Sequence, residues 1–425
     1  MCALDASERK MFTKSKFSGP KKFGVRNFSR TARPGGGQRP NNFRRGGRGP
    51  ANGGRSRFGE KIDINLFVKK AIVRDEKPVE AEHTFYDFNF CNAIKSNLEV
   101  KNYIIPTPIQ DQAMEHILAG RDLIGLANTG TGKTAAFLLP MIDKVYNNKM
   151  EKVLIIAPTR ELAMQIDNEL RQFSWGMKIF SAACVGGMPI YKQINNLRRN
   201  PSFIIGTPGR LKDLADRGLI RLENFKNVVL DEVDRMLDMG FIDDIKELLS
   251  KTPVEKQSLF FSATMPEKIE RLVKEFTKDP ITIAVKTGNT AENVDQDIVR
   301  VRDRAMKFIQ LRELLHGDDL KKVLIFIETK AEVERLTNNL VTEGFKADSI
   351  HGDKKQHQRQ RALKSFKDND VDILVATDVA ARGLDIENVS HVINYTIPQT
   401  YNDYIHRIGR TGRANKKGVA LTFVE

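Results

Sequence analysis

The sequence predicts an α/β protein in which two tandem domains with parallel sheets follow a disordered basic tail. The prediction depends on the length of the chain, on short apolar runs that alternate with amphipathic helical stretches, and on the distribution of charge. A chain of 425 residues exceeds what one hydrophobic core usually organises, so two domains are expected. Hydrophobic residues make up 40% of the chain and charged residues 29%, a composition that excludes disorder throughout.

The tail comprises residues 1–60, whose composition differs from that of the rest of the chain. It contains 15 Lys and Arg residues against three acids, a net charge of +12 out of +15 for the whole chain. It holds 11 of the 30 glycines and six Phe residues but only two branched aliphatic residues, so it cannot form a core. Basic side chains neutralise phosphates and aromatic rings stack on unpaired bases, which favours RNA as the ligand over a tail that only solubilises the chain or forms condensates.

Short apolar runs predict a first domain at residues 84–285, after a connecting segment at 61–83. Each run ends in a turn that contains Gly, Pro, Ser or Asp, as buried parallel strands do. Amphipathic patterns at Glu161–Phe173 and Leu211–Arg217 predict helices between the strands, so the connections are of the βαβ type. The predicted strands are Leu123–Ala127, Val153–Ala157, Phe203–Gly206, Val228–Leu230 and Leu259–Phe261.

A second series of the same kind predicts a second domain at residues 294–425. The polar segment 286–293 (KTGNTAEN) separates the two series and is expected to be an interdomain linker. The strands predicted in the second domain are Val323–Ile327, Ile373–Ala376, Val392–Asn394 and Val419–Val424.

The sequence shows no sign of a membrane or secreted protein. No apolar run approaches the roughly 18 residues that cross a bilayer, and the N-terminus has no apolar segment of the kind found in secretion signals. Cys2, Cys91 and Cys184 are odd in number and far apart, so we expect neither a disulfide framework nor a Cys-x-x-Cys metal site. We therefore expect reduced thiols and a cytoplasmic protein, also nuclear if the source is eukaryotic.

A glycine-rich segment, Ala127–Thr134 (ANTGTGKT), follows the first predicted strand and opens a helical stretch. Small residues let the backbone curl so that several N–H groups point inward, and the following helix adds its dipole. Lys133 supplies a positive charge for the β- and γ-phosphates of a nucleotide, and Thr134 can bind Mg²⁺. A turn that only joins strand to helix is the alternative, but this spacing favours a phosphate-binding loop.

Two acids, Asp231 and Glu232, come directly after the predicted strand Val228–Leu230. A carboxylate at the carboxyl end of a strand parallel to the phosphate-loop strand can hold Mg²⁺, which we expect of Asp231. Glu232 is placed to orient or deprotonate the attacking water in phosphoryl transfer. Capping of a helix would be the alternative role for Asp231 alone, but the phosphate loop favours the metal.

An arginine cluster lies in the second predicted domain. In the segment 406–413 (HRIGRTGR), Arg407, Arg410 and Arg413 recur every third residue. A basic run by itself is usually a solvated surface or a nucleic-acid patch. Because the chain has two domains and one phosphate loop, we instead expect arginine fingers that complete a nucleotide site when the domains close.

Together these segments resemble the DEAD-box family of ATP-dependent RNA helicases, within helicase superfamily 2. The resemblance covers essentially all of residues 84–425, with the motifs in the family's order and spacing. They include Phe85 ahead of NYIIPTPIQ at 102–110, the phosphate loop, PTRELA at 158–163, DEVD at 231–234, SAT at 262–264 and ATDVAARGLD at 376–385. His406 and the Ala that begins the phosphate loop favour the DEAD-box class over the DEAH type. The resemblance implies two RecA-like domains that use ATP and Mg²⁺ and bind RNA.

The resemblance also implies roles for single residues. In the nucleotide site, Phe85 would stack on adenine, Gln110 would read its edge and Asp385 would contact the ribose. The other implied nucleotide contacts are Thr129, Gly130, Thr131, Gly132, Lys133, Thr134 and Arg382, and the implied catalytic group is Lys133, Asp231, Glu232, Arg410 and Arg413. The implied RNA contacts are Thr159, Arg160, Gly187, Thr207, Arg210, Gln356, Arg359 and Thr377, and Ser262 and Thr264 would couple hydrolysis to strand separation.

Three features depart from the family pattern. Val233 replaces the usual Ala of the DEAD motif, and its bulk beside Ser262–Thr264 is expected to alter coupling modestly. Asn102 replaces a Gly, and because Asn tolerates left-handed backbone conformations better than most residues, we expect the turn to be retained. Family members usually continue with a further helix, so the second domain, which stops at Glu425, is expected to be truncated.

The resemblance implies that ATP lies between the domains and that closure requires it. Single-stranded RNA would be held through phosphates and 2′-hydroxyls with little base reading. A kinked strand that fits the closed form cannot stay paired, so closure would open short duplexes and hydrolysis would release the RNA. An ATP-gated RNA clamp with little unwinding and a DNA translocase are the alternatives. We expect a monomer, and the sequence identifies no protein partner.

Deleting residues 1–60 is expected to weaken RNA affinity and to flatten its dependence on salt. For a single strand, each lost phosphate contact lowers the slope of log affinity against log salt by up to ~0.7. Fluorescence anisotropy titrations over a range of salt concentrations measure this slope. An unchanged slope would mean that the tail only solubilises the chain.

Overall fold

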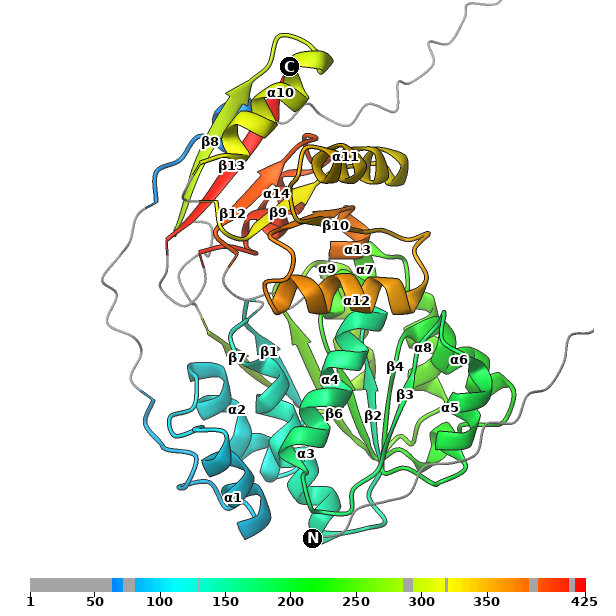
Figure 1. Cartoon of the computed structure of the whole chain (residues 1–425). Helices are drawn as coiled ribbons and strands as arrows, with labels where there is room; N and C mark the ends of the chain where they lie inside the picture. The colour runs from blue at the N-terminus through cyan, green and yellow to red at the C-terminus, as the bar shows by residue number, and fades with distance from the viewer. Residues whose placement is uncertain are drawn as a thin grey trace, which may run out of the picture. The chain divides into compact units, whose positions relative to one another are not determined.

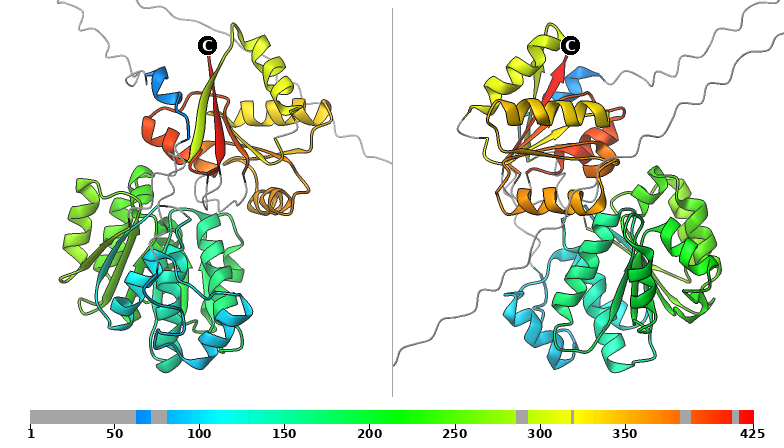
Figure 2. Two further views of the ribbon diagram at one scale, coloured as in Figure 1. Left: turned by 90° about the vertical axis from the view of Figure 1, so that its left-hand side faces the viewer. Right: turned by 45° about the vertical axis from the view of Figure 1, so that its right-hand side comes forward.

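The computed structural model describes residues 63–71, 81–128, 130–285, 293–317, 320–381, 389–412 and 417–425. The predicted tail and nearly all of the predicted linker lie outside these residues. Within them the chain forms two parallel sheets, each with helices on both faces (Figure 1, Figure 2). The predicted α/β class and the two parallel sheets are confirmed. No helix in the described part of the chain is long and apolar enough to cross a membrane.

The first sheet has seven strands in the order β3-β4-β2-β5-β6-β1-β7, and all neighbours pair in parallel. Five strands occupy the predicted apolar runs: β1 (Leu123–Leu126), β2 (Val153–Ile156), β4 (Phe203–Gly206), β5 (Asn227–Leu230) and β6 (Gln257–Ser262). Two further strands, β3 (Ser181–Cys184) and β7 (Ile281–Ala284), were not predicted and form the two edges of the sheet.

Helices pack on both faces of this sheet. The predicted helices at 161–173 and 211–217 correspond to α4 and α6. The helices are α1 (Asn92–Val100), α2 (Pro108–Leu118), α3 (Lys133–Asn147), α4 (Arg160–Phe173), α5 (Ile190–Leu197), α6 (Pro208–Asp216), α7 (Val233–Asp238), α8 (Ile242–Ser250) and α9 (Glu267–Phe276), with a 3₁₀-helix η2 (Leu222–Asn224).

The central strands of the first sheet are buried on both faces. Along β2, Val153 and Ile155 belong to one hydrophobic cluster, whereas Leu154 and Ile156 belong to the cluster on the opposite face. Helices α2, α3 and α4 contribute to the first cluster, and α6, α7, α8 and α9 contribute to the second. Burial on both faces explains why these strands appear in the sequence as continuous apolar runs.

Strand β1 passes very close to a side chain of its neighbour β6. Gly125 is paired with Phe261, and a Cβ at Gly125 would lie 2.6 Å from carbon atoms of that ring. The ring also packs against Phe137 of α3, with the centroids 5.3 Å apart. Because Phe137 holds the Phe261 ring in place against β1, residue 125 has to be small.

Replacing Gly125 with Ala is expected to lower the free energy of unfolding of the first domain by about 1–3 kcal/mol, because the added methyl group overpacks the core. Gly209→Ala is the matched control, since a Cβ at Gly209 meets no atom within 4 Å. Urea unfolding followed by the fluorescence of Trp175, the single tryptophan, reports on this domain. Equal urea midpoints for the two variants would contradict the close packing.

The second sheet has six parallel strands in the order β10-β11-β9-β12-β13-β8. The four central strands occupy the predicted runs: β9 (Val323–Phe326), β11 (Ile373–Ala376), β12 (His391–Asn394) and β13 (Gly418–Val424). Again the unpredicted strands, β8 (Val294–Arg300) and β10 (Ala347–Ile350), are the edges. The helices are α10 (Arg304–Leu315), α11 (Lys330–Thr342), α12 (Gln356–Lys367), α13 (Asp378–Ala381) and α14 (Tyr401–Ile408).

The short segment Asp63–Ala71 associates with the second sheet. It contains the 3₁₀-helix η1 (Ile64–Phe67) and one antiparallel bridge, between Lys69 and Gln296 of β8. It is the blue segment near β8 in Figure 1 and is seen from two further sides in Figure 2. The sequence predicted only a connecting segment here.

Candidate functional site

Apart from Phe85 and Gln110, the candidate residues of the first domain follow six neighbouring strands at their carboxyl ends. Because these strands are parallel, the loops after them meet at one edge of the sheet. A phosphate-loop group follows β1, β5 and β6 and consists of residues 127–134, Asp231–Glu232 and Ser262–Thr264. A threonine–arginine group follows β2, β3 and β4 and consists of Thr159–Arg160, Gly187 and Thr207–Arg210. Each group comes from three adjacent strands, so the two groups divide the edge between them.

The phosphate loop runs from the end of β1 to the start of α3. Gly130 and Gly132 have φ angles of 85° and 90°, a left-handed conformation that side chains rarely adopt. Lys133 is buried, and its Nζ donates a hydrogen bond to the carbonyl oxygen of Ala127 at 2.7 Å. The ammonium group of Lys133 therefore lies against the loop that it is expected to serve.

Two polar side chains brace this loop. Gln110 of α2 accepts a hydrogen bond from the backbone N–H of Thr107 at 2.9 Å, and its Nε2 donates to the carbonyl oxygen of Gly132 at 3.0 Å. A Cβ at Gly132 would lie 2.4 Å from Gln110 Nε2, so the contact requires glycine. Within the loop, Thr131 Oγ1 donates to the carbonyl oxygen of Asn128 at 2.8 Å. These contacts connect the predicted adenine-reading residue to the predicted phosphate site.

Phe85 is buried, with only 2% of it exposed. Its ring lies 5.8 Å from that of Tyr103 and 6.4 Å from that of Phe88, measured between centroids. Stacking on adenine needs an uncovered ring face, so this role stays a prediction. Asn102 has a φ angle of 56°, which confirms that Asn supplies the left-handed turn expected at this position.

Asp231 is a buried carboxylate at the end of β5. Its Oδ1 accepts a hydrogen bond from the backbone N–H of Glu232 at 3.0 Å. Burial raises the pKa of Asp231 to about 7, although the positive charge of Lys133 acts in the opposite direction. Burial makes the ionised form of this carboxylate unfavourable, and a cation bound beside it would stabilise that form.

The oxygen donors at this place are of the kind that Mg²⁺ takes. The described residues contain no cluster of three or more His, Cys, Asp or Glu side chains that could hold a metal ion. Mg²⁺ is commonly bound by one or two protein oxygens, with water and phosphate oxygens as the remaining ligands. Asp231 and the half-buried hydroxyl of Thr134, in the first turn of α3, are the protein oxygens that suit this role.

Glu232 is held by an arginine that the sequence analysis did not identify. Its Oε2 lies 2.5 Å from Arg235 Nη1, and both side chains are buried. Burial acts to raise the pKa of Glu232, but Arg235 and Lys133 outweigh it and hold that pKa below its usual value. Glu232 is thus ionised at neutral pH, as a general base must be. The sequence did contain a sign of this pair, because an acid and an arginine three residues apart at the start of a helix can form an ion pair.

Asp234 joins the turn after β5 to the turn after β6. Its Oδ2 accepts hydrogen bonds from the backbone N–H groups of Ala263 and Thr264 at 3.1 and 2.9 Å and from Thr264 Oγ1 at 3.1 Å. Ser262 Oγ accepts from the backbone N–H of Asp234 at 3.2 Å and donates to the carbonyl oxygen of Thr264. The buried Val233 belongs to the hydrophobic cluster on the α7 face. The two predicted coupling residues are therefore attached to the acidic turn by side-chain contacts.

In the threonine–arginine group, Arg160 lies against the two glycines that follow β3. A Cβ at Gly187 would lie 2.3 Å from Arg160 Nη1, and one at Gly186 would lie 3.2 Å from Arg160 Nη2. Gly187 has a φ angle of 74°. Thr159 is the N-cap of α4, where its Oγ1 accepts a hydrogen bond from the backbone N–H of Leu162. The loop after β2 and the loop after β3 are thus brought together through one guanidinium group.

Arg210 is positioned by a buried amide that was also not predicted. Its Nη1 donates to Gln193 Oε1 at 3.1 Å, and Gln193 Nε2 donates to the carbonyl oxygen of Val185 at 2.9 Å. Thr207 is the N-cap residue of α6, one turn before Arg210. Gln193 lies in the amphipathic helix α5, and nothing in the sequence distinguishes this buried glutamine from one on the surface.

In the second domain, the predicted RNA-binding residues follow two neighbouring strands, β10 and β11. Gln356 and Arg359 lie in the first turn of α12, and Thr377 directly follows β11. Since β10 and β11 pair in parallel, the loops that carry these residues leave the sheet at the same edge. This arrangement resembles that of the threonine–arginine group in the first domain.

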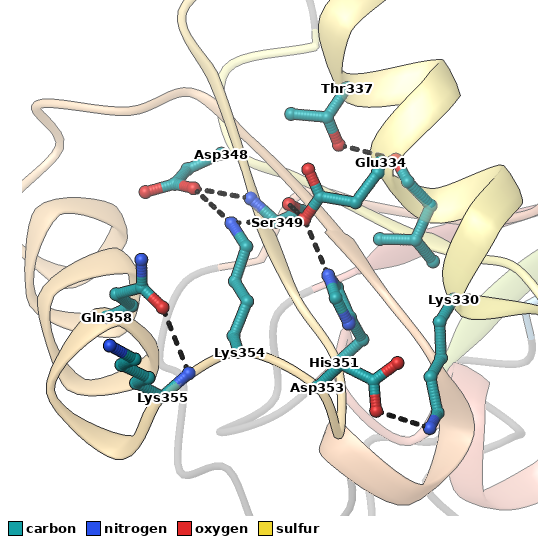
Figure 3. A network of polar contacts seen from close by, with 11 residues as sticks. Lys330, Glu334, Thr337, Asp348, Ser349, His351, Asp353, Lys354, Lys355 and Gln358 are labelled. Carbon is teal, nitrogen blue, oxygen red and sulfur yellow. Dashed lines mark hydrogen bonds and ion pairs between the residues drawn. The ribbon is translucent and has the colours of Figure 1, made fainter. Parts of the chain in front are cut away.

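A polar network fixes the loop between β10 and α12 (Figure 3). Glu334 of α11 lies 2.5 Å from His351 Nε2 and accepts a hydrogen bond from Ser349 Oγ at 3.0 Å. From the same helix, Lys330 Nζ lies 2.6 Å from Asp353 Oδ1. Helix α11 therefore anchors the loop immediately before Gln356 and Arg359 begin α12.

Within the arginine cluster, Arg407 is held by contacts within the second domain. Arg407 is buried, and its Nε and Nη2 each lie 2.6 Å from an oxygen of Asp378, while its Nη1 donates to the carbonyl oxygen of Thr396 at 2.7 Å. The periodicity suggested three candidate fingers, but Arg407 connects α13 to β12, because its Nη1 also donates to Asn394 Oδ1 of β12 at 3.2 Å. Arg410 lies just beyond α14 and is buried. Thr129, Arg382, Asp385 and Arg413 lie outside the described residues.

Comparison with known proteins gives a consistent result. A family model described as "DEAD/DEAH box helicase" matches residues 107–272, and one described as "Helicase conserved C-terminal domain" matches residues 306–415. The chain is 44% identical over 342 residues to the ATP-dependent RNA helicase CshA of Limosilactobacillus reuteri, covering 80% of this chain and 69% of that protein. The protein of the same name from Listeria monocytogenes is 45% identical over 343 residues, covering 80% of this chain and 66% of that protein.

Solved structures give the same picture. The structure of S. cerevisiae Dbp5 bound to RNA and ADP BeF3 is similar to this chain with a TM-score of 0.71 and 33% identity. The similarity covers 80% of this chain and 89% of that one.

Replacing Asp234 with Ala is expected to lower the free energy of unfolding of the first domain by about 1–3 kcal/mol, because the donors at 263 and 264 lose their acceptor. Asp243→Ala is the control, since Asp243 is exposed in the first turn of α8, and a change within about 0.5 kcal/mol is expected. Urea unfolding measures both. Equal stability of the two variants would show that Asp234 does not hold the two turns together.

Proposed function

This chain belongs to the DEAD-box family of ATP-dependent RNA helicases, and we propose that it opens short RNA duplexes locally when ATP and RNA draw its two domains together. In this proposal the strand that stays bound is gripped without regard to its sequence. ATP hydrolysis to ADP and phosphate then reopens the protein and releases the RNA.

In the nucleotide site, the phosphate loop would hold the β- and γ-phosphates through its backbone N–H groups and Lys133. Thr134 and Asp231 would hold Mg²⁺, which neutralises charge on the phosphates when it is bound. Glu232, kept ionised by Arg235, orients and deprotonates the attacking water. Gln110, whose amide already contacts the loop, would recognise the adenine edge. These roles agree with the burial and hydrogen bonds of the residues.

The RNA site would be built from the threonine–arginine group, with Gln356, Arg359 and Thr377 supplied by the second domain. Backbone N–H groups at helix starts, threonine hydroxyls and guanidinium groups all suit phosphate oxygens. Threonine hydroxyls and guanidinium groups suit phosphates and 2′-hydroxyls, so the proposed recognition is of the sugar–phosphate backbone. The Dbp5 structure that resembles this chain is described as bound to RNA.

Closure would bring Arg410 and Arg413 of the second domain to the nucleotide, where they would stabilise negative charge on the transferred phosphoryl group. The second domain would then also complete the RNA site. A bent strand that contacts both domains cannot remain in an A-form duplex, and this would open the base pairs next to it. The free energy for opening comes from the difference in affinity between the closed and open forms.

One observation carries this proposal: Asp234 connects the acidic turn, which bears Glu232, to the Ser262–Thr264 turn through its side chain. A movement of the acidic turn when the nucleotide phosphates bind or leave would therefore also move the Ser262–Thr264 turn. An ATP-gated clamp that holds RNA with little unwinding is the second candidate, because it would use the same two sites. Strand release from a short duplex that requires ATP and Glu232 distinguishes the helicase from the clamp.

Lys133→Ala and Glu232→Gln are each expected to lower the turnover number for RNA-stimulated ATP hydrolysis at least about 100-fold, because charge neutralisation or base catalysis is lost. RNA binding by the basic tail is expected to persist. Lys149→Ala and Glu223→Gln are the matched controls, since both residues are exposed. Phosphate release assays and strand separation on a short duplex measure the effect, and turnover unchanged from that of the controls would refute the site.

A further inference from the structure

The segment Asp63–Ala71 is bound to the second domain, although it precedes the first domain in the chain. The backbone N–H of Lys69 donates to the carbonyl oxygen of Gln296 at 3.0 Å, and the N–H of Gln296 donates back to Lys69 at 2.8 Å. The N–H of Ala71 donates to Asp295 Oδ1 at 2.8 Å. Strand β8 is an edge of its sheet, and such edges are usually covered or blunted.

A single aromatic side chain anchors this segment. Phe67 is completely buried in a cluster with Val294, Tyr404, Ile408 and Ala420 of the second domain. Its ring lies 4.6 Å from that of Tyr404, measured between centroids. The hydroxyl of Tyr404 in turn donates to Gln296 Oε1 at 3.0 Å, which ties the aromatic pocket to the bridged position of β8.

The neighbours of Phe67 in the chain remain exposed. Leu66 is 46% exposed and Val68 is 51% exposed, whereas Phe67 is 0% exposed. The contact is therefore a specific insertion of one side chain, combined with strand pairing at Lys69, and not a general collapse of apolar residues onto the surface. The Asp63 side chain caps η1 by accepting a hydrogen bond from the N–H of Asn65.

We propose that residues 63–71 form an intramolecular clip that ties the N-terminal side of the first domain to the β8 edge of the second. The two domains are then joined in two ways: covalently through residues 286–293, and through residues 72–80 together with the non-covalent contacts of the clip. The chain between these two connections forms a closed loop. The part of the proposal that concerns opening and closing rests on the proposed function.

The short second connection limits how far the domains separate. Ten residue steps join Ala71 to Ala81, and at about 3.3–3.6 Å per residue they cannot span more than about 36 Å. A tether of this kind raises the effective concentration of one domain at the other and reduces the entropy lost on closure.

Hydrogen exchange of the full chain tests whether the clip is docked. Phe67→Asp is expected to speed exchange of the Gln296 and Ala71 amides at least about tenfold, because a charge cannot occupy the apolar pocket. Leu66→Asp is the matched control and should leave both amides protected. Phe67→Ala should give an intermediate rate. Unchanged exchange in Phe67→Asp would overturn the proposal.

Fluorescence energy transfer tests whether the docked clip restrains the domains. Dyes on Val254→Cys and Val341→Cys, positions that are 92% and 52% exposed in the first and second domains, report their separation once Cys2 and Cys91 are replaced by Ser. Cys184 can stay, because burial raises its pKa to about 12 and leaves it unreactive. Without nucleotide or RNA, Phe67→Asp should widen the distance distribution relative to Leu66→Asp. Identical distributions would overturn the tether.

Kinetics separate this proposal from the proposed function. Phe67→Asp is expected to raise the KM for RNA in ATP hydrolysis at least about threefold and to change kcat less than about twofold, because the clip contacts neither ligand. Replacing residues 63–71 by a Gly/Ser segment of equal length should reproduce this effect. Exchange and energy transfer need neither ATP nor RNA, so failure of the helicase assignment would leave them unaffected. An unchanged KM together with an unchanged distance distribution would contradict the clip's role.

Discussion

The candidate site depends above all on the parallel pairing of β2 with β5. In this register Ile156 lies beside Leu230, and the ladder continues as the N–H of Asp231 donates to the carbonyl oxygen of Ile156 at 3.0 Å. The last residues of the two strands therefore place Asp231 beside the loop that begins at Pro158. At this pair of strands the phosphate-loop group meets the threonine–arginine group. The order of the strands therefore places the proposed nucleotide site beside the residues proposed to bind RNA.

The same edge concentrates features that are unfavourable for folding. Asp231, Glu232 and Arg235 are buried charges, and Glu232 has a φ angle of 53°, which is uncommon for residues other than glycine. Such costs are tolerated where function requires them, and the surrounding structure keeps the residues in place. Here two hydrophobic clusters hold β5 on both of its faces. A rigid sheet thus supports polar residues that would be unstable in isolation.

The sequence was sufficient to predict the central strands and to place the glycine-rich and acidic turns directly after two of them. The edge strands and the residues that support these turns required the structure. The four unpredicted strands, β3, β7, β8 and β10, are the outer strands of their sheets. Their sequences, such as SAAC and VDQDIVR, are small or polar because they have one neighbour instead of two. The spacing of the arginines also gives no sign that Arg407 binds Asp378. The role of Phe67 depends on a pocket whose residues lie more than 200 positions away in the sequence.

We propose that nucleotide and RNA favour one and the same closed form, so that each strengthens the binding of the other. The most direct measurement is the affinity of the full chain for single-stranded RNA with and without a non-hydrolysable ATP analogue, together with the affinity for the analogue with and without RNA. If both ligands favour the same closed form, each should raise the affinity for the other by the same factor, at least about fivefold. Affinities for RNA that are equal with and without the analogue would contradict it.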